Sequence, residues 1–263
     1  MARSTSIIEL GHWATTAPGR YLFDWEQARL DEAVADAFGF HALQLGLPGL
    51  EALRANRMPQ RWLADETTDG TGVMLCCEFD ALPFASDSLD LIVLPHALEF
   101  ARDPHLMLRE VERVLRPEGR IVITGFNPTS LFGLRQRLAR TRLGLRQPPE
   151  AVGAPREGSF IGYWRMRDWL RLLGFAIEGG QFGCWRPPLR SERWLARLQW
   201  LDRVGERWWP VLGAAYLLVA VKRVQGMRLV GLARRVRRSA RASTRAVAQR
   251  ESAKVRPAER EPA

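Results

Sequence analysis

Two apolar runs separated by a short amphipathic segment constrain the fold of this chain more than any other feature of its sequence. Residues 89–95 (LDLIVLP) and 120–126 (RIVITGF) read as strands buried on both faces, which is typical of a parallel sheet. Between them, Asp103-Pro104 predicts the start of a helix, with Asp as the N-cap and Pro at the first helical position. Strand, helix and strand at this spacing predict a βαβ unit with a right-handed crossover.

The helix of this unit has a clear division of faces. Its apolar stripe consists of Met107, Leu108, Val111, Val114 and Leu115. The charged positions between them are expected to face water, namely Arg109, Glu110, Glu112 and Arg113. Residues 116–119 (RPEG) are expected to end the helix.

Weaker patterns predict the remaining elements. In the first part of the chain we expect a helix over 24–38 between Asp24 and Gly39, a strand over 41–46, a helix over 50–56, and strands over 61–66 and 73–80. In the second part we expect a helix near 130–141, a Pro/Gly-rich loop over 147–158, a helix over 165–175, a strand over 176–182, a helical core over 191–207 and a strand over 211–221. Together these elements predict an α/β, Rossmann-like fold with a mostly parallel sheet and helices on both faces.

The charge of the chain is concentrated at one end. Residues 1–221 carry 26 Arg, no Lys and 26 acidic residues, whereas residues 222–263 carry 13 basic and 3 acidic residues. The net charge of +10 therefore belongs to the tail, so the body is not expected to bind nucleic acid as a basic protein does. A tail of this kind is expected to be disordered and to make weak contact with nucleic acid or an anionic surface.

The elements and the charge distribution together predict three parts: a helical extension over 1–40, a main domain over 41–223 with a helical insertion near 185–210, and the Arg-rich tail over 224–263.

The most apolar run, 211–221, is too short for a membrane span, which needs about 20 residues. The first residues lack the apolar segment of a secretory signal. Three cysteines without metal-ligand spacing predict no metal site. We expect a soluble cytoplasmic protein without a transmembrane segment.

Ligands of open α/β sheets bind beyond the carboxyl ends of the strands, where the strand order reverses. Applied to the predicted strands, this rule selects 46–49, Asp65 and Glu66, 78–80, 95–98, and 126–127.

Residues 78–128 (EFDALPFASDSLDLIVLPHALEFARDPHLMLREVERVLRPEGRIVITGFNP) carry a resemblance that covers about a fifth of the chain. Their spacing of acidic, Leu-Pro-Phe, Asp-Pro and Arg-Val-Leu-x-Pro-x-Gly motifs resembles the central stretch of the type 11 group of class I S-adenosylmethionine (SAM)-dependent methyltransferases. Residues 125–135 and 165–175 further resemble a proteobacterial subgroup of that family. The resemblance implies a seven-stranded sheet, SAM as cofactor, and methyl transfer to an unidentified small-molecule or macromolecular acceptor.

It also assigns candidate site residues, because Glu78 matches the usual acidic residue on the adenine side. The expected cofactor contacts are Gly46, Leu47, Gly49, Asp65 (with Glu66 as the alternative ribose ligand), Glu78, Phe79, Asp80, Pro95 and His96. His96 is the one histidine at a predicted carboxyl end, and it is a candidate general base. The candidate substrate-side residues are Asn127, Tyr163 and Trp164, although a turn at Asn127 and packing by the two aromatic residues are alternative interpretations.

The first motif of the family normally reads D-x-G-x-G-x-G, but residues 44–49 read QLGLPG. Gln44 replaces the acidic residue, one glycine is missing, and Pro48 has no backbone N–H to donate. Three functions therefore stand beside one another: a SAM-dependent methyltransferase acting chiefly by orientation, a binding or scaffold protein with a degenerate methyltransferase fold, and an RNA-associated methyltransferase that uses the basic tail.

Overall fold

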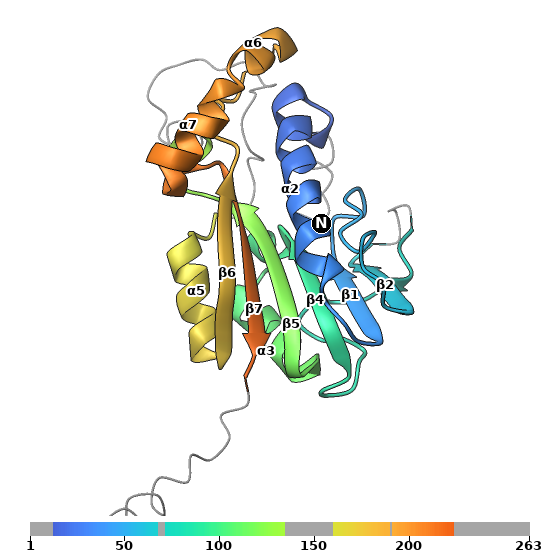
Figure 1. The fold of residues 1–263 in the computed structure, drawn as a ribbon. Coiled ribbons are helices and arrows are strands. Elements are labelled where there is room, and N and C mark those ends of the chain that lie inside the picture. The colour runs from blue at the N-terminus through green and yellow to red at the C-terminus, as the bar shows by residue number, and fades with distance from the viewer. Residues whose placement is uncertain (1–12, 68–71, 135–159, 190, 224–263) are drawn as a thin grey trace, which may run out of the picture. The chain divides into compact units, whose positions relative to one another are not determined.

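The structure is a computed structural model that describes residues 13–67, 72–134, 160–189 and 191–223 (Figure 1). The predicted loop over 147–158 and the tail over 224–263 lie outside these ranges, as does the predicted helix near 130–141 beyond its helical residues 131–134. The chain divides into two compact units after Val224, and the description below concerns the first of them.

Seven strands form one sheet in the order β3-β2-β1-β4-β5-β7-β6. They are β1 (His41–Leu45), β2 (Gln60–Asp65), β3 (Leu75–Cys76), β4 (Leu89–Pro95), β5 (Leu115–Phe126), β6 (Phe175–Gly183) and β7 (Ala215–Lys222). β1 to β5 pair in parallel, whereas β7 is antiparallel to both β5 and β6. The predicted α/β, mostly parallel, seven-stranded fold is confirmed, and the strand order reverses between β1 and β4.

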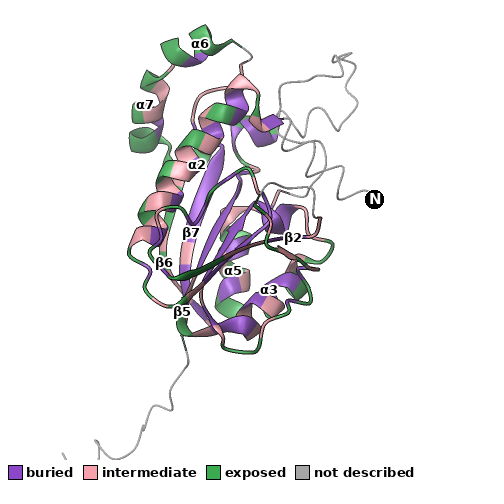
Figure 2. Cartoon of the chain, turned by 90° about the vertical axis from the view of Figure 1, so that its right-hand side faces the viewer, coloured by how far each residue is buried: buried purple, intermediate pink, exposed green. Residues whose placement is uncertain are grey.

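Helices cover both faces of the sheet (Figures 1 and 2). They are α2 (Ala17–Ala35), α3 (Pro104–Val114), α5 (Tyr163–Leu172), α6 (Glu192–Arg197) and α7 (Trp200–Trp208), with short 3-10 turns η1 (Ala97–Glu99) and η2 (Pro210–Leu212). The helix α2 packs on one face of the sheet, where its Leu22, Leu30 and Val34 share a core with residues of β4 and β5. The helices α3 and α5 pack in a second core on the other face. Among the described helices, none combines the length and apolarity that crossing a bilayer requires.

The central βαβ unit forms as predicted, because its signals are local. The Oδ1 atom of Asp103 accepts hydrogen bonds from the backbone of His105 and Leu106, and Pro104 opens α3. Both flanking strands are almost entirely buried at their centres, as expected for parallel strands with helices on each side.

Several predicted boundaries were wrong. The first helix starts at Ala17 rather than near Asp24, because the Thr16 hydroxyl caps it by accepting from the Gly19 N–H. The strand predicted over 73–80 is only Leu75–Cys76, and the last strand starts at Ala215 after the η2 turn. Residues 116–119 do not separate α3 from a later strand, since β5 already begins at Leu115.

The predicted helical core over 191–207 consists of two helices, α6 and α7. They lie beyond one end of the sheet (Figure 1). Because Phe126 at the carboxyl end of β5 pairs with Ala215, just after η2, this is the end to which the parallel strands point.

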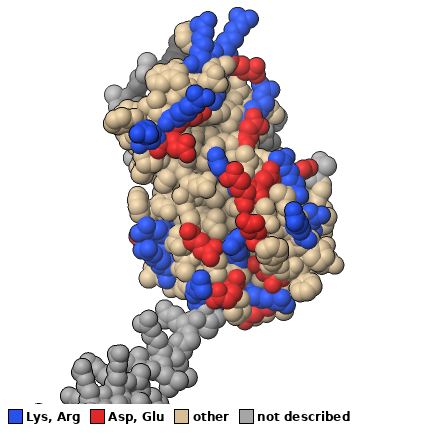
Figure 3. All heavy atoms as spheres, in the orientation of Figure 1, with Lys and Arg blue, Asp and Glu red and all other residues tan. Residues whose placement is uncertain are grey.

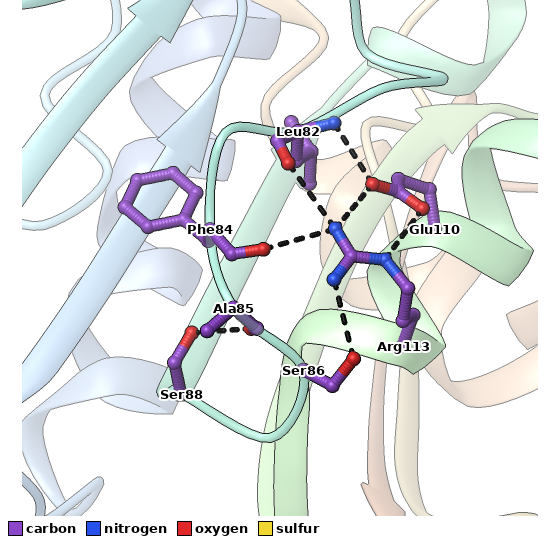
Figure 4. A network of polar contacts seen from close by, with 7 residues as sticks. All are labelled: Leu82, Phe84, Ala85, Ser86, Ser88, Glu110 and Arg113. Atoms are coloured by element: carbon purple, nitrogen blue, oxygen red, sulfur yellow. Dashed lines mark hydrogen bonds and ion pairs between the residues drawn. The ribbon is translucent and has the colours of Figure 1, made fainter.

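Two residues expected to face water instead fix the loop before β4 (Figure 4). The Arg113 guanidinium donates to the carbonyls of Leu82 and Phe84 and to the hydroxyl of Ser86. Glu110 binds this guanidinium and accepts from the Leu82 N–H. The loop over 82–86 is thereby held to α3, directly after the candidate residues at 78–80.

We predict that Arg113→Ala lowers the free energy of unfolding by about 1–3 kcal/mol, because it removes a charged donor from two backbone carbonyls and from Glu110. Arg109→Ala is the matched control, since Arg109 is exposed on the same helix. Urea unfolding measures both variants, and equal loss in the two would contradict the role of Arg113 in holding the loop over 82–86 to α3.

Candidate functional site

The carboxyl ends of β1 and β4 meet at the switch point of the sheet, and the residues that follow them form the candidate site. Gly46 comes directly after β1 and His96 directly after β4. Phe79, in the loop after β3, is buried, and its ring would lie 3.6 Å from a Cβ atom added to Gly46. The structure therefore brings three of the predicted cofactor segments together at one edge.

Gln44 shapes the loop after β1 from inside the protein. Its side chain is buried, and its amide nitrogen lies within hydrogen-bond distance of three backbone carbonyls, those of Gly46, Leu47 and Leu50. Its amide oxygen accepts from the Ala52 N–H at 3.0 Å. A carboxylate at this position could accept but not donate, so the loop with these carbonyls turned inward requires an amide.

The helix predicted over 50–56 is wrong. The chain there forms consecutive turns, closed by bonds from Leu50 N to Leu47 O, Arg54 N to Glu51 O and Asn56 N to Leu53 O. Within these turns, the Leu50 carbonyl and the Ala52 N–H also bind the side-chain amide of Gln44. Gln44 thus stabilises the turns that are found in place of the predicted helix.

Gly46 and Gly49 differ in what their backbones require. Gly46 has φ +79°, a left-handed conformation in which L-residues are strained. Gly49 has no positive φ and no atom within 4 Å of an added Cβ, so it faces open space. Leu47, between them, adopts φ +49° and is buried.

The two acidic residues beside Phe79 are exposed. The carboxylates of Glu78 and Asp80 make no hydrogen bond or ion pair within the described ranges of the chain. Asp65, at the end of β2, is instead buried, and its Oδ1 accepts from the Glu66 N–H at 2.8 Å. Among the residues predicted to bind the cofactor, Glu78 and Asp80 therefore have carboxylates without a hydrogen-bond partner in the described ranges. The carboxylate of Asp65 already accepts a hydrogen bond.

His96 is the centre of a buried ionic bridge. Its Nε2 lies 2.8 Å from Glu26 Oε1 and its Nδ1 lies 2.8 Å from Glu99 Oε2. The other oxygen of Glu99 accepts from the Phe126 N–H at 2.7 Å. The bridge therefore joins α2, the end of β4, η1 and the end of β5, and its side chains are almost completely buried.

The carboxylates of this bridge keep the His96 imidazole protonated. Burial by itself lowers the pKa of His96, but the carboxylates of Glu26 and Glu99 outweigh it and raise the pKa from 6.5 to about 10. Burial also raises the pKa of Glu99, against the lowering effect of His96. With both ring nitrogens bound and a proton retained at neutral pH, this geometry argues against His96 as a general base.

The predicted substrate-side residues do not gather at this bridge. Asn127 is buried, and its amide donates to the carbonyls of Val211 and Gly213, so in the structure it fastens η2 to the end of β5. Tyr163 packs against Phe182 and Tyr216, and Trp164 is exposed with Arg167 over its ring. Asn127 also accepts from the Thr129 N–H in a local turn, so the contacts of all three residues are structural ones.

Sequence reasoning missed Glu26 and gave Gln44 no role. The signal for Glu26 was present, since it lies in the i, i+4 row Leu22, Glu26, Leu30, Val34, whose other members are apolar and buried. An acidic residue in a core-facing row predicts a buried partner. Gln44 had no comparable signal, because its partners lie in a loop whose path it determines.

Comparisons with known proteins show which family the chain belongs to. A family model described as a methyltransferase domain matches residues 52–123. The chain is 31% identical over 221 residues to YafS, an uncharacterized protein of Escherichia coli K12, which covers 83% of each chain. The chain belongs to the type 11 family of class I methyltransferases.

Other members and neighbours match less of the chain or less closely. A malonyl-[acyl-carrier protein] O-methyltransferase of Laribacter hongkongensis is 32% identical over 134 residues, which is 51% of this type 11 chain and 41% of the relative. Among solved structures, the protein bound to the Haloferax volcanii Trm112 methyltransferase activator has a TM-score of 0.55 at 19% identity, covering 84% and 98% of the two chains. A SAM-dependent methyltransferase of Archaeoglobus fulgidus has a TM-score of 0.53 at 18% identity, covering 76% and 94%. These two structures share the fold.

We predict that Gly46→Ala lowers the free energy of unfolding by about 1–2 kcal/mol, because alanine is strained at φ +79°. Gly49→Ala is the control, since it meets open space without a positive φ, and it should unfold like the unsubstituted protein. Thermal and urea unfolding of both variants would measure the difference. Similar stability of the two would show that the loop after β1 relaxes freely.

A second prediction concerns the pH dependence of the bridge. The folded pKa of His96 lies above its unfolded value, so the stability it contributes is fully present below about pH 6.5 and declines as the pH rises toward 10. Glu26→Gln removes one carboxylate, which reduces the rise in pKa. The decline in unfolding free energy between pH 6.5 and 10 should therefore be smaller in this variant, by more than about 1 kcal/mol.

The control is Glu32→Gln on the exposed face of the same helix, where Glu32 pairs with Arg29. Its pH profile should follow that of the unsubstituted protein. If Glu26→Gln and Glu32→Gln gave the same profile, the ion pair between Glu26 and His96 would not contribute as described.

Proposed function

We propose that this protein binds SAM at the switch point of its sheet and transfers the methyl group to an acceptor that remains to be identified. The observation that carries the proposal is the meeting of Gly46 and Phe79 at the carboxyl edge, with the unengaged carboxylates of Glu78 and Asp80 on either side of Phe79. Membership of the type 11 family supports methyl transfer as the reaction class.

The residues at this edge fit an adenosyl group in most respects. Glu78 and Asp80 are exposed acceptors that would bind the adenine amine or the ribose hydroxyls through charge-assisted hydrogen bonds. Gly49 leaves open space beside the loop. Asp65 fits less well, because its carboxylate is buried and already accepts a hydrogen bond.

When bound, SAM supplies a methyl group on a positively charged sulfur, which a nucleophile displaces in line. In this proposal the protein contributes orientation and exclusion of water. Gln44 fixes the loop after β1, and Arg113 with Glu110 fixes the loop after the adenine-side residues. Glu26 holds α2 against the same edge through His96. Since His96 has no free ring nitrogen to take a proton, the acceptor is expected to carry an atom that is nucleophilic without deprotonation by His96.

A binding or scaffold protein without methyl transfer is the second candidate. It is favoured by the missing helix after β1 and by Pro48, which removes a backbone donor from the loop. Both features reduce the number of backbone N–H groups available to a bound nucleoside. The two candidates differ in whether SAM binds at all.

We predict that S-adenosylhomocysteine, the demethylated product, binds the protein and that Glu78→Ala weakens its binding free energy by about 1–3 kcal/mol through the loss of one hydrogen bond to a charged acceptor. Asp168→Ala is the matched control, because Asp168 is an exposed carboxylate on α5 that makes no described contact. Isothermal titration calorimetry measures the three dissociation constants.

Equal constants for the two variants would exclude Glu78 as a ligand. The absence of heat from the unsubstituted protein at high micromolar nucleoside would instead favour the second candidate.

A further inference from the structure

The segment over residues 192–212, which we call the Trp–Arg segment, exposes large apolar side chains. Four tryptophans are each more than half exposed, and two aliphatic residues of η2 accompany them: Trp194, Trp200, Trp208, Trp209, Val211 and Leu212. Trp208 alone is 70% exposed. Exposed apolar residues concentrated in one short segment indicate a surface that is covered by a partner.

The acidic residues of the segment are mostly neutralised from within the protein. Glu192 pairs with Arg20 of α2, and Asp202 pairs with Arg186 and accepts from the Tyr21 hydroxyl. Among the described residues, only Glu206 of the segment's three acids has no such partner.

The arginines are in the opposite situation. Four of them are exposed and have no ion pair within the described ranges: Arg193, Arg197, Arg203 and Arg207. Arg197 lies over the ring of Trp194, with its guanidinium carbon 5.2 Å from the ring centroid. In Figure 3, basic side chains project at the end of the molecule where α6 lies. The segment therefore presents positive charge and apolar area together.

The segment is held firmly enough to act as a preformed surface. The indole ring of Trp185 packs directly against Gly205, where an added Cβ would come within 2.2 Å of that ring. The indole Nε1 of Trp185 donates to the Trp209 carbonyl. Asn127 binds the Val211 carbonyl from the end of β5. Exposure of the tryptophans is thus a property of a packed structure.

We propose that the Trp–Arg segment docks on an anionic phospholipid surface. Indole rings are favoured at the boundary between lipid headgroups and acyl chains, and arginines beside them pair with lipid phosphates while their alkyl stems cover apolar surface. A second copy of this protein and a nucleic acid both match the chemistry of the segment less well than a lipid surface does. A symmetric contact with a second copy would oppose the same unpaired arginines, and a nucleic acid offers no apolar partner for Val211 and Leu212. This inference is independent of the proposed methyl transfer.

Flotation of the full-length protein with vesicles tests the proposal. The vesicles contain equal parts of phosphatidylglycerol and phosphatidylcholine, with phosphatidylcholine alone as the lipid control. The test variant is Trp208→Ala/Trp209→Ala. The matched variant is Phe38→Ala/Phe40→Ala, which removes two aromatic side chains of 82% and 65% exposure that directly precede β1, at the amino end of the parallel strands. All variants keep the same basic tail, so attraction of the tail to lipid is common to them.

We expect the unsubstituted protein to float with the anionic vesicles and the phenylalanine variant to match it. The tryptophan variant should need at least about tenfold more lipid for half-binding, because it loses interfacial apolar area. Thermal unfolding midpoints confirm that both variants remain folded. Equal binding of the two variants, or no flotation of the unsubstituted protein, would overturn the proposal. So would a dimer in sedimentation that the tryptophan variant abolishes, because the segment would then be a contact between copies.

Discussion

The buried bridge from Glu26 through His96 to Glu99 is the interaction on which the carboxyl edge of this protein depends. An ion pair removed this completely from water adds little net stability, because the loss of hydration offsets the attraction between its charges. Removing one member would leave a buried charge without a partner, which is strongly unfavourable. The bridge therefore acts mainly on position: it determines where α2 lies relative to the end of β4, and His96 adopts a left-handed φ of +54° to complete it.

The loop after β1 is also positioned by a buried polar side chain, but here the groups are neutral. Gln44 brings a side-chain donor to the backbone carbonyls of Gly46, Leu47 and Leu50, which a carboxylate could not do, so the turn as it is built depends on an amide at this position. At both sides of the switch point, an inward-facing side chain fixes the strand end. The acidic residues left for a ligand are those of the loop after β3, which is held at its far end by Arg113.

The sequence predicted what is determined locally. The strands β4 and β5 and the helix between them could be recognised because burial on two faces and the cap at Asp103 leave direct patterns. The helix over 50–56 was predicted wrongly, since its periodicity is helical and the competing partner, Gln44, acts across a turn. Asn127 was ambiguous for a similar reason, because its carbonyl partner Val211 comes 84 residues later. Contacts of this kind arise only once the chain has folded.

The helix α2 connects the two regions on which the proposals rest. Near its start, Tyr21 donates to Asp202 of α7, and little more than one turn later Glu26 binds His96 at the switch point. A helix transmits position along its length because its hydrogen bonds keep it rigid. The turn η2, which follows α7 in the chain, is held to the end of β5 by Asn127. Movement of α7 relative to the sheet must therefore strain the contact at Asn127 and either break the contact at Tyr21 or displace α2, and with it the carboxylate that faces His96.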